Sequence, residues 1–227
     1  MVNMDLILYN PKSKNSKANV QTHKLVRTYK KEGKPFRLKS ILKIHDIKEY
    51  LDKRQHYEKI ILLGGDGTIH QLINDLADYD IKQQIYIKRN GSGNDFLRSL
   101  KNNDEKPQYL MQATLDNKSS HYFMNGTGIG IDGLTIDFVD KAKSKGKLTY
   151  FLSSLRAVFS YVPEPVDVEI DGKKMHFKKT YLAVVNNGRF VGGGMEMTPK
   201  ARIDDENLDV MIVHKIPKFM LLLVFSS

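Results

Sequence analysis

The chain has 227 residues, enough for one large domain or two small ones, and 41% of them are hydrophobic, which supports a packed core. It contains no cysteine, which excludes disulfides and thiolate metal sites, and it shows neither a signal peptide nor an apolar run long enough to span a bilayer. The net charge of +10 suits nucleic acid, anionic lipid or phosphorylated substrates, or simply a lysine-rich surface. The lysines are not interleaved with aromatic residues, so no single-stranded nucleic-acid site is expected.

The first 90 residues alternate between strand and helix patterns. Apolar or alternating runs predict strands at 4–9, 36–41, 60–63 and 85–87. Amphipathic patterns predict helices at 18–31, 46–57 and from 69 onward. This order predicts parallel β-α-β units, in which ligands bind beyond the carboxyl ends of the strands. The polar loops at Asn10, Gly64 and Gly91 are therefore expected to lie at one ligand-binding edge.

The pattern changes near residue 115. Strand-like runs follow at 121–131, 166–170, 175–185 and 208–213, with one helix at 148–161. Asp171-Gly172 between two alternating runs indicates a hairpin. Residues 118–216 are therefore predicted to form a mainly antiparallel β domain with one helix. The apolar end at 217–227 could cover an open edge, mediate homodimer contacts or touch a membrane.

The stretch from Lys59 to Asp75 combines an apolar strand, the turn Gly64-Gly65-Asp66-Gly67-Thr68, and a helix start. This order places backbone N–H groups at a helix N-terminus, where unpaired donors and the helix dipole favour a phosphate. Glycines would allow phosphate oxygens to approach the backbone. A tight turn without a ligand is the alternative. The turn lacks the Lys-Ser/Thr of a Walker loop and the spaced glycines of a dinucleotide fingerprint.

Three motifs in this order resemble the diacylglycerol kinase catalytic-domain family, which includes bacterial soluble lipid kinases and sphingosine kinases. They are Asn10-Pro11-Lys12-Ser13, Gly64 to Thr68, and Gly91-Ser92-Gly93-Asn94-Asp95-Phe96. The second motif alone is shared with NAD kinases and phosphofructokinases, so the first and third narrow the resemblance. A later run from Gly192 to Asp209 resembles a further family segment. The resemblance covers about residues 4–213.

The resemblance implies an α/β fold in two domains. The N-terminal domain, residues 1–117, is expected to be a three-layer, phosphofructokinase-like, nucleotide-binding domain. Residues 118–227 are expected to form a mainly antiparallel β-sandwich domain whose C-terminal part is missing. The implied reaction transfers the γ-phosphoryl group of ATP to a lipid hydroxyl, with Mg²⁺ as cofactor. Diacylglycerol is the default acceptor, which would give phosphatidic acid as product.

The resemblance also assigns roles to residues. Asp66 and Asp95 are the expected catalytic carboxylates, since phosphoryl transfer depends on positioning and on charge neutralisation. The expected nucleotide-binding residues are Asn10, Pro11, Lys12, Ser13, Lys14, Gly64, Gly65, Asp66, Gly67, Thr68, Ile69, His70, Gln71, Ser92 and Asn94. The expected Mg²⁺ ligands are Asp205, the backbone carbonyls of Arg202 and Asn207, and, through water, Asp116.

Other interpretations of these residues stay open on the sequence alone. Asp95 could cap a helix that starts at Phe96, Asp116 could be an ordinary turn residue, and Asp204-Asp205 could be a plain loop. His70 replaces the asparagine common in the family and is expected to make a contact only. Glu206 replaces the family's glycine, and would cost about 1 kcal/mol if that turn requires a positive φ.

No Asp-Gly-Glu occurs in the 227 residues, although the family's proposed general base, which accepts the lipid hydroxyl proton, lies in such a segment. Without that base, the rate is expected to fall roughly 10²–10⁴-fold.

The first hypothesis is therefore a lipid kinase, cytoplasmic and peripheral at the inner face of an anionic membrane, that is inactive or weak as this chain. The alternatives are an NAD kinase-like or other small-molecule kinase, and a non-catalytic nucleotide- or lipid-binding protein. Nucleic acid is not an expected partner.

Overall fold

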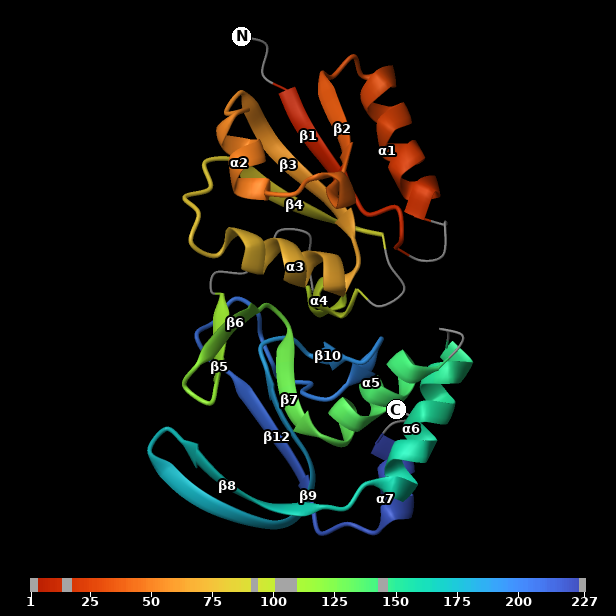
Figure 1. Cartoon of the computed structure of the whole chain (residues 1–227), viewed down its shortest axis with the longest axis vertical. Helices are drawn as coiled ribbons and strands as arrows, with labels where there is room; N and C mark the ends of the chain where they lie inside the picture. Colours follow the sequence, from red (N-terminus) through yellow and green to blue (C-terminus); the bar gives the residue numbers. More distant parts are fainter. Residues whose placement is uncertain (1–3, 14–17, 91–93, 101–109, 143–146, 225–227) are drawn as a thin grey trace. The chain divides into compact units, whose positions relative to one another are not determined.

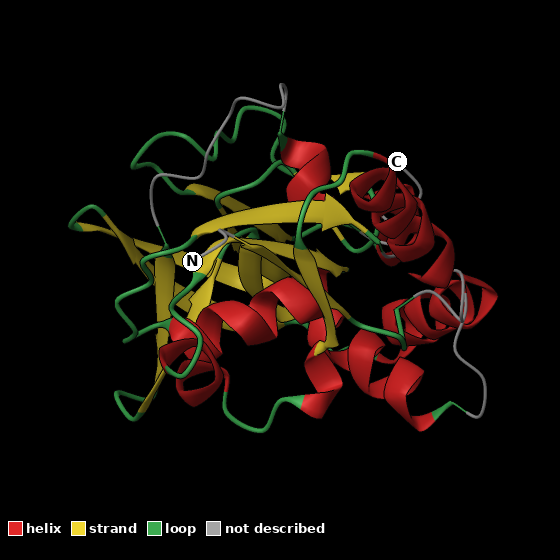
Figure 2. Ribbon diagram, turned by 90° about the horizontal axis from the view of Figure 1, so that it is seen from above, coloured by secondary structure: helices red, strands yellow, loops and turns green. Residues whose placement is uncertain are grey.

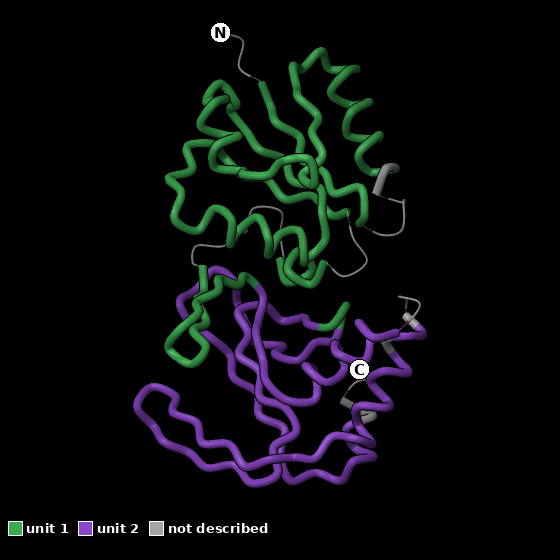
Figure 3. The backbone as a smooth tube through the Cα atoms, viewed as in Figure 1, with its two compact units in different colours: residues 1–124, 192–194 green, residues 125–191, 195–227 purple. Residues whose placement is uncertain are grey.

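The structure is a computed structural model that describes residues 4–13, 18–90, 94–100, 110–142 and 147–224. The chain forms two compact units, each of which contains both helices and strands (Figures 2 and 3). Unit 1 comprises Met1–Met124 and Gly192–Gly194. Unit 2 comprises Asn125–Val191 and Met195–Ser227.

Unit 1 is built on a parallel sheet with the strand order β2-β1-β3-β4 (Figure 1). The strands are β1 (Met4–Tyr9), β2 (Phe36–Ser40), β3 (Tyr57–Gly64) and β4 (Gln84–Arg89). The two central strands are nearly continuous apolar runs, because helices cover both of their faces. Leu6, Leu8, Leu62 and Leu63, for example, are at most 1% exposed.

Helices lie on both faces of this sheet. They are α1 (Ala18–Lys31), the 3₁₀ turn η1 (Ile41–Lys43), α2 (Ile47–Asp52), α3 (Asp66–Leu76) and α4 (Asp95–Ser99). Tyr29 of α1 packs with Ile7, Ile61 and Leu63. Alternate residues of a strand point to opposite faces, so Leu6, Ile60 and Leu62 face the other layer, where α3 packs on β3. The predicted α/β domain with a parallel sheet is confirmed.

The helix predicted at 46–57 is shorter than expected. Asp46 caps α2 by accepting a hydrogen bond from the Glu49 N–H at 3.0 Å, but the helix ends at Asp52. The residues beyond it are needed elsewhere, since the buried Tyr57 begins β3 and pairs with Met4 of β1.

The β5–β6 hairpin belongs to unit 1, so the unit ends after Met124 rather than at the predicted residue 117. Its strands are β5 (Met111–Leu115) and β6 (Ser119–Phe123). Asn74 of α3 donates to the Tyr122 carbonyl and accepts from the Tyr122 N–H, both at 2.9 Å. This pair of bonds ties the hairpin to the α/β layer, although its sequence reads as part of the β-rich half.

Unit 2 contains an antiparallel sheet with the order β12-β9-β7, and β8 pairs with the other half of the long β9. The strands are β7 (Gly126–Gly130), β8 (Glu164–Ile170), β9 (Lys173–Asn186) and β12 (Asp209–His214), with a small ribbon of β10 (Phe190–Val191) and β11 (Met195–Glu196). The run predicted as one strand at 121–131 is divided between β6 and β7. The predicted hairpin is confirmed: Asp171 and Gly172 have φ values of 49° and 76°, as a type I′ turn requires.

The prediction of one helix in the second half of the chain is wrong. Unit 2 has α5 (Ile131–Lys141), α6 (Lys147–Ser160) and α7 (Lys218–Val224). Ile131, Val158 and Leu221 from the three helices pack with Leu182 and Val184 of β9 in one core. Within the described residues, the sheet thus packs on helices and not on a second large sheet, as a sandwich would.

Candidate functional site

The loops that follow β1, β3 and β4 meet at one edge of the unit 1 sheet. The Asn10 N–H donates to the Leu63 carbonyl at 3.1 Å, and the Asn90 N–H donates to the Gly64 carbonyl at 3.2 Å. The end of β3 is therefore flanked by both neighbouring loops, as the parallel arrangement predicted. Gly91, Ser92 and Gly93 of the third motif lie outside the described residues.

The helix α3 begins directly at this edge. Gly65 is its N-cap, and the Gly65 carbonyl accepts from the N–H groups of Thr68 and Ile69 at 2.9 and 3.1 Å. The first N–H groups of a helix have no partner within it, so they can bind an anion. α3 starts three residues earlier than predicted, which makes Asp66 its first residue.

Asn10 connects the β1 loop to this helix start. Its Nδ2 donates to Thr68 Oγ1 at 2.9 Å, and its Oδ1 accepts from the Lys12 N–H at 2.9 Å. The Ser13 N–H also donates to the Asn10 carbonyl at 3.2 Å. The Asn10 side chain therefore holds its own loop in a turn against α3. Lys14 lies outside the described residues.

The glycines of the turn have different tasks. We expected glycine at position 64 to give a ligand access to the backbone. Instead, a Cβ atom on Gly64 would lie 2.6 Å from Thr68 Cβ, so glycine is required there because the start of α3 packs against it. A Cβ atom on Gly67 would meet nothing within 4 Å. Gly67 therefore borders open space at the helix start, which is where a phosphate would need room.

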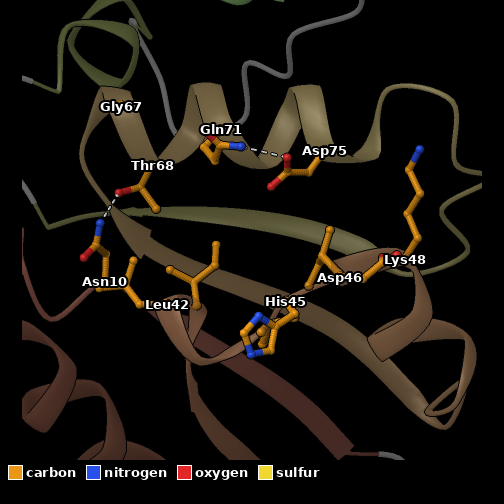
Figure 4. Close-up of a pocket in the computed structure, with 12 residues that line it drawn as sticks. Asn10, Leu42, His45, Asp46, Lys48, Gly67, Thr68, Gln71 and Asp75 are labelled. Carbon is orange, nitrogen blue, oxygen red and sulfur yellow. Dashed lines mark hydrogen bonds between the residues drawn. The ribbon is translucent and has the colours of Figure 1, made fainter.

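A cavity of about 640 Å³ lies beside Gly67, within unit 1 (Figure 4). One wall is the outer side of α3, with Gln71 bonded to Asp75 at 2.7 Å, and Asn10 and Thr68 close one end. The opposite wall comes from the segment after β2. Its residues are Ile41, Leu42, Ile44, His45, Asp46, Ile47 and Lys48.

Asp95 is the first residue of α4 and is 5% exposed. Its Oδ2 accepts from the Gly193 N–H at 2.7 Å, and its Oδ1 accepts from Arg98 Nη1 at 3.1 Å. Burial raises the pKa of Asp95 above its ordinary value, and the charge of nearby Asp66 raises it further. The hydrogen bond from the Gly193 N–H and the charge of Arg98 lower this pKa but do not cancel the increase. The N-cap of α4 is Asn94 at φ 61°, so the alternative of Asp95 as a cap is wrong.

Asp66 lies beside the start of α4. Its Oδ1 accepts a long hydrogen bond, 3.4 Å, from the Phe96 N–H. Asp66 is only partly buried, and it shares this region with Asp95, whose pKa it helps to raise. Two carboxylates thus lie at the N-termini of two helices, and Asp66 directly precedes Gly67.

The other predicted nucleotide residues differ in how far they face this site. His70 is exposed on α3, with its carbonyl accepting from Asn74 Nδ2 at 2.9 Å. Ile69 is 3% exposed, so only its backbone can contact a ligand, and its nucleotide-binding role stays a prediction. Asn94 is buried, and Pro11 and Gly65 are partly exposed.

In the described part of the chain, no group of three or more His, Asp or Glu side chains could hold a metal ion. Asp116 opens the β5–β6 turn of unit 1 at φ 50°, whereas Arg202, Asp205 and Asn207 belong to unit 2. The Asp205 Oδ1 accepts from the Asn207 N–H at 3.0 Å. These four residues stay a prediction.

Glu206 does not have the positive φ that would have strained its backbone. It is not among the described residues with positive φ, so this turn does not demand glycine. The neighbouring Asp204 is held by Arg202, whose guanidinium makes two 3.0 Å bonds to its carboxylate.

Sequence reasoning missed one side of the site. The segment after β2 lines the cavity, yet no motif marked it. The available signal was the position of β2 in the parallel sheet, since its carboxyl end must lie at the same edge as those of β1 and β3. Gly193, which donates to Asp95, was also missed, because a contact across 98 residues leaves no local pattern. Arg98 was missed although it lies only three residues after Asp95.

Comparison with known proteins identifies the family. Residues 5–124 match the model of the diacylglycerol kinase catalytic domain, which is more than half of the chain. The chain belongs to this family. Residues 126–227 match the YegS C-terminal NAD kinase beta sandwich-like domain. The boundary between the two matches agrees with the end of the main segment of unit 1 at Met124.

Two curated relatives come from Bacillus subtilis (strain 168). YtlR is 30% identical over 202 residues, which cover 77% of this chain and 62% of that protein. A diacylglycerol kinase is 30% identical over 173 residues, which cover 71% of this chain and 56% of that protein. The chain thus spans less than two thirds of the length of either relative.

Solved structures from Bacillus anthracis strain Sterne share the fold. One, described as a diacylglycerol kinase, matches with a TM-score of 0.65 at 23% identity, over 99% of this chain and 78% of that chain. Another matches with a TM-score of 0.70, over 99% and 80%. An α/β domain followed by an antiparallel β domain is therefore shown.

Proposed function

We propose that this family member is an ATP-dependent lipid kinase that transfers the γ-phosphoryl group to a lipid hydroxyl. The observation that carries the proposal is the junction of Asn10, Gly67 and Thr68, where a turn, an open glycine and a helix N-terminus border one cavity. The N–H groups at the start of α3 would bind the phosphates, and the apolar side chains after β2 would pack on the nucleoside.

The carboxylates have separate tasks in this proposal. Asp66, next to the proposed phosphate site, would orient the reacting groups. Asp95, which is fixed by Gly193 and Arg98, would add a second negative charge beside it. Two adjacent carboxylates next to a phosphate site suit Mg²⁺, which usually binds through one or two carboxylates plus phosphate oxygens and neutralises their charge. Asp116, Arg202, Asp205 and Asn207 are proposed as a further Mg²⁺ site.

The acceptor that we propose is diacylglycerol, with phosphatidic acid as product, at the cytoplasmic face of an anionic membrane. The family and the diacylglycerol kinase among the relatives support this acceptor. A second candidate is ATP and lipid binding without turnover, which the assay below separates from the kinase.

The test is phosphoryl transfer from γ-labelled ATP, with Mg²⁺, to diacylglycerol in mixed micelles, beside NAD and a sphingoid base. Labelled phosphatidic acid as the main product supports the kinase. Stabilisation of the fold by ATP without labelled lipid would select the binding protein, and labelled NADP would overturn both candidates.

A further inference from the structure

Asp75 lines the cavity of unit 1 at a distance from its phosphate end (Figure 4). It lies on the same helix as Gly67, about 12 Å further along the axis, because each residue of an α-helix rises about 1.5 Å. Asp75 Oδ1 accepts a hydrogen bond from Gln71 Nε2 at 2.7 Å. Both side chains belong to exposed residues of α3 and line the cavity, so the pair is accessible to a bound molecule.

The stability of α3 does not account for this carboxylate. Asp75 is the last residue but one of the helix, where the helix dipole disfavours a negative charge. A glutamine–aspartate bond at this spacing stabilises a helix only slightly. A carboxylate in a cavity that binds phosphates would also repel them, unless it serves the end of the ligand that carries no charge. These costs indicate a role for Asp75 in the cavity.

Asp75 decides which way the Gln71 amide is turned. An ionised carboxylate only accepts hydrogen bonds, so of the two polar ends of the amide only Nε2 can bond to it. The Oε1 atom of Gln71 must then point away from Asp75. Gln71 therefore presents a hydrogen-bond acceptor, whereas an unrestrained glutamine could present either its oxygen or its nitrogen.

The position of Gln71 indicates which part of a nucleotide would meet this acceptor. Gln71 lies one helical turn beyond Gly67, about 6 Å along the axis, and side chains of a helix lean toward its N-terminus. In a nucleotide, the ribose is the group joined directly to the phosphates, and its 2′- and 3′-hydroxyls can donate hydrogen bonds. The opposite wall carries Ile41, Leu42 and Ile44, which suit the flat base.

We propose that Asp75 is a positioning residue, which holds the Gln71 amide so that Oε1 accepts a hydrogen bond from a ribose hydroxyl. The inference rests on the proposed function, since ATP must bind in this cavity with its phosphates at the start of α3. It adds a basis for selecting ribonucleotides over deoxyribonucleotides. The amino group of adenine is the other donor in the nucleoside, but it belongs to the base, which packs on the apolar wall in this arrangement.

The experiment is calorimetric titration with Mg²⁺ and ATP, 2′-deoxy-ATP, 3′-deoxy-ATP or ITP, which lacks the amino group of the base. The wild type is expected to bind at least one of the deoxy analogues about 3- to 10-fold more weakly than ATP, as the loss of one hydrogen bond predicts. Asp75→Asn is expected to reduce this ratio to about twofold or less, because asparagine both donates and accepts and no longer fixes the amide. Asp75→Glu, which still only accepts, is expected to retain the ratio.

Two comparisons separate positioning from direct contact and from general effects. Gln71→Leu removes the acceptor and is expected to abolish the discrimination, and adding Asp75→Asn to it is expected to change nothing more, because Asp75 acts through Gln71. A further loss in the double variant would mean that Asp75 contacts the nucleotide itself and would overturn the positioning role. Asp78→Asn, an exposed carboxylate that does not line the cavity, is expected to keep the wild-type ratio.

The remaining outcomes distinguish this inference from the proposed function. Equal discrimination by the wild type and Asp75→Asn would overturn the inference, as would a variant that changes the ratio of ATP to ITP affinity and leaves the deoxy ratios as they were. Phosphorylation of diacylglycerol by a wild type that does not discriminate against either deoxy analogue would support the kinase and overturn the role of Asp75. The expected ratios without any labelled lipid would count against the kinase and support the role of Asp75.

Discussion

Asp66 and Asp95 occupy the same local position and have different surroundings. Each is the first residue of a helix that follows a strand of the parallel sheet, and glycines stand between strand and helix in the sequence. Asp66 begins an eleven-residue helix and makes one long hydrogen bond, whereas Asp95 begins a five-residue helix and is buried, with both oxygens bound at 2.7 and 3.1 Å. Local sequence thus sets where a carboxylate lies, and distant partners set whether it can meet a ligand.

The largest effect is expected for Asp66→Ala. Removal of the more open carboxylate should lower kcat for lipid phosphorylation about 10³-fold or more, because it deletes charge at the phosphate site. The thermal midpoint should stay close to that of the wild type. Asp78→Ala, an exposed carboxylate two residues after α3, is the control and should keep full activity. An active Asp66→Ala protein would mean that the site is misassigned.

Asp95→Asn tests the buried partner. We expect kcat to fall about 10²-fold, since the Arg98 pair is lost while the side chain keeps its shape. If ATP affinity also stays within a few-fold of the wild type, Asp95 acts on the reaction step and not on nucleotide binding. A variant with normal kcat would show that Asp95 serves packing alone.

The same variant yields a pH prediction. In the unfolded chain, Asp95 should lose its proton near the ordinary pKa of about 3.9. In the folded protein its pKa is raised, so the side chain keeps its proton to a higher pH. The free energy of unfolding of the wild type relative to Asp95→Asn should therefore fall as the pH rises from about 4 through the folded pKa, and then level off. Urea unfolding at several pH values measures this difference, and a rise over that interval would contradict the assignment.

Gly64→Ala and Gly67→Ala form a matched pair three residues apart. Alanine at 64 would collide with Thr68 and should lower the free energy of unfolding by about 1–3 kcal/mol. Alanine at 67 meets nothing and should leave stability unchanged or raise it by up to about 1 kcal/mol, because glycine is a poor helix residue. Equal melting temperatures for the two variants would refute this distinction.

The smallest effect is expected for Asn10→Ala. The variant loses the 2.9 Å bond to Thr68 and the turn at Lys12, each worth about 0.5–1.5 kcal/mol. ATP affinity should fall about 3- to 10-fold with kcat nearly unchanged, as titration calorimetry and steady-state kinetics can show. Asn74→Ala, which frees the β5–β6 hairpin on the other side of α3, is expected to affect stability more than nucleotide affinity.

Unit 1 was largely predictable because its strands are short, apolar and separated by polar turns. The run from Ile60 to Leu63 could only be a buried strand or helix segment, and the following glycines decided for a strand. A parallel sheet then brings Asn10, Gly64 and Asn90 together without further information. The cavity wall after β2 was not predictable in the same way, because its residues carry no motif.

Unit 2 was harder because the sequences of α5 and α7 give weak local signals for a helix. The segment from Ile131 to Lys141 follows a glycine-rich strand and contains Gly133, Thr135 and Ile136, all weaker helix formers than alanine, yet it folds as α5. α7 follows Pro217 and is almost wholly apolar, so it shows no helical period. Packing in the shared core stabilises both helices, and a single sequence does not show that core.

Titration of ATP and of adenosine into the wild type and Gly67→Ala tests the phosphate site at α3 most directly. If the helix start binds phosphate beside open space, ATP should bind more tightly than adenosine to the wild type. Gly67→Ala should then weaken ATP about tenfold, about 1.4 kcal/mol, and leave adenosine unchanged. Equal affinities for ATP and adenosine, or an ATP affinity insensitive to the added methyl group, would place the nucleotide elsewhere.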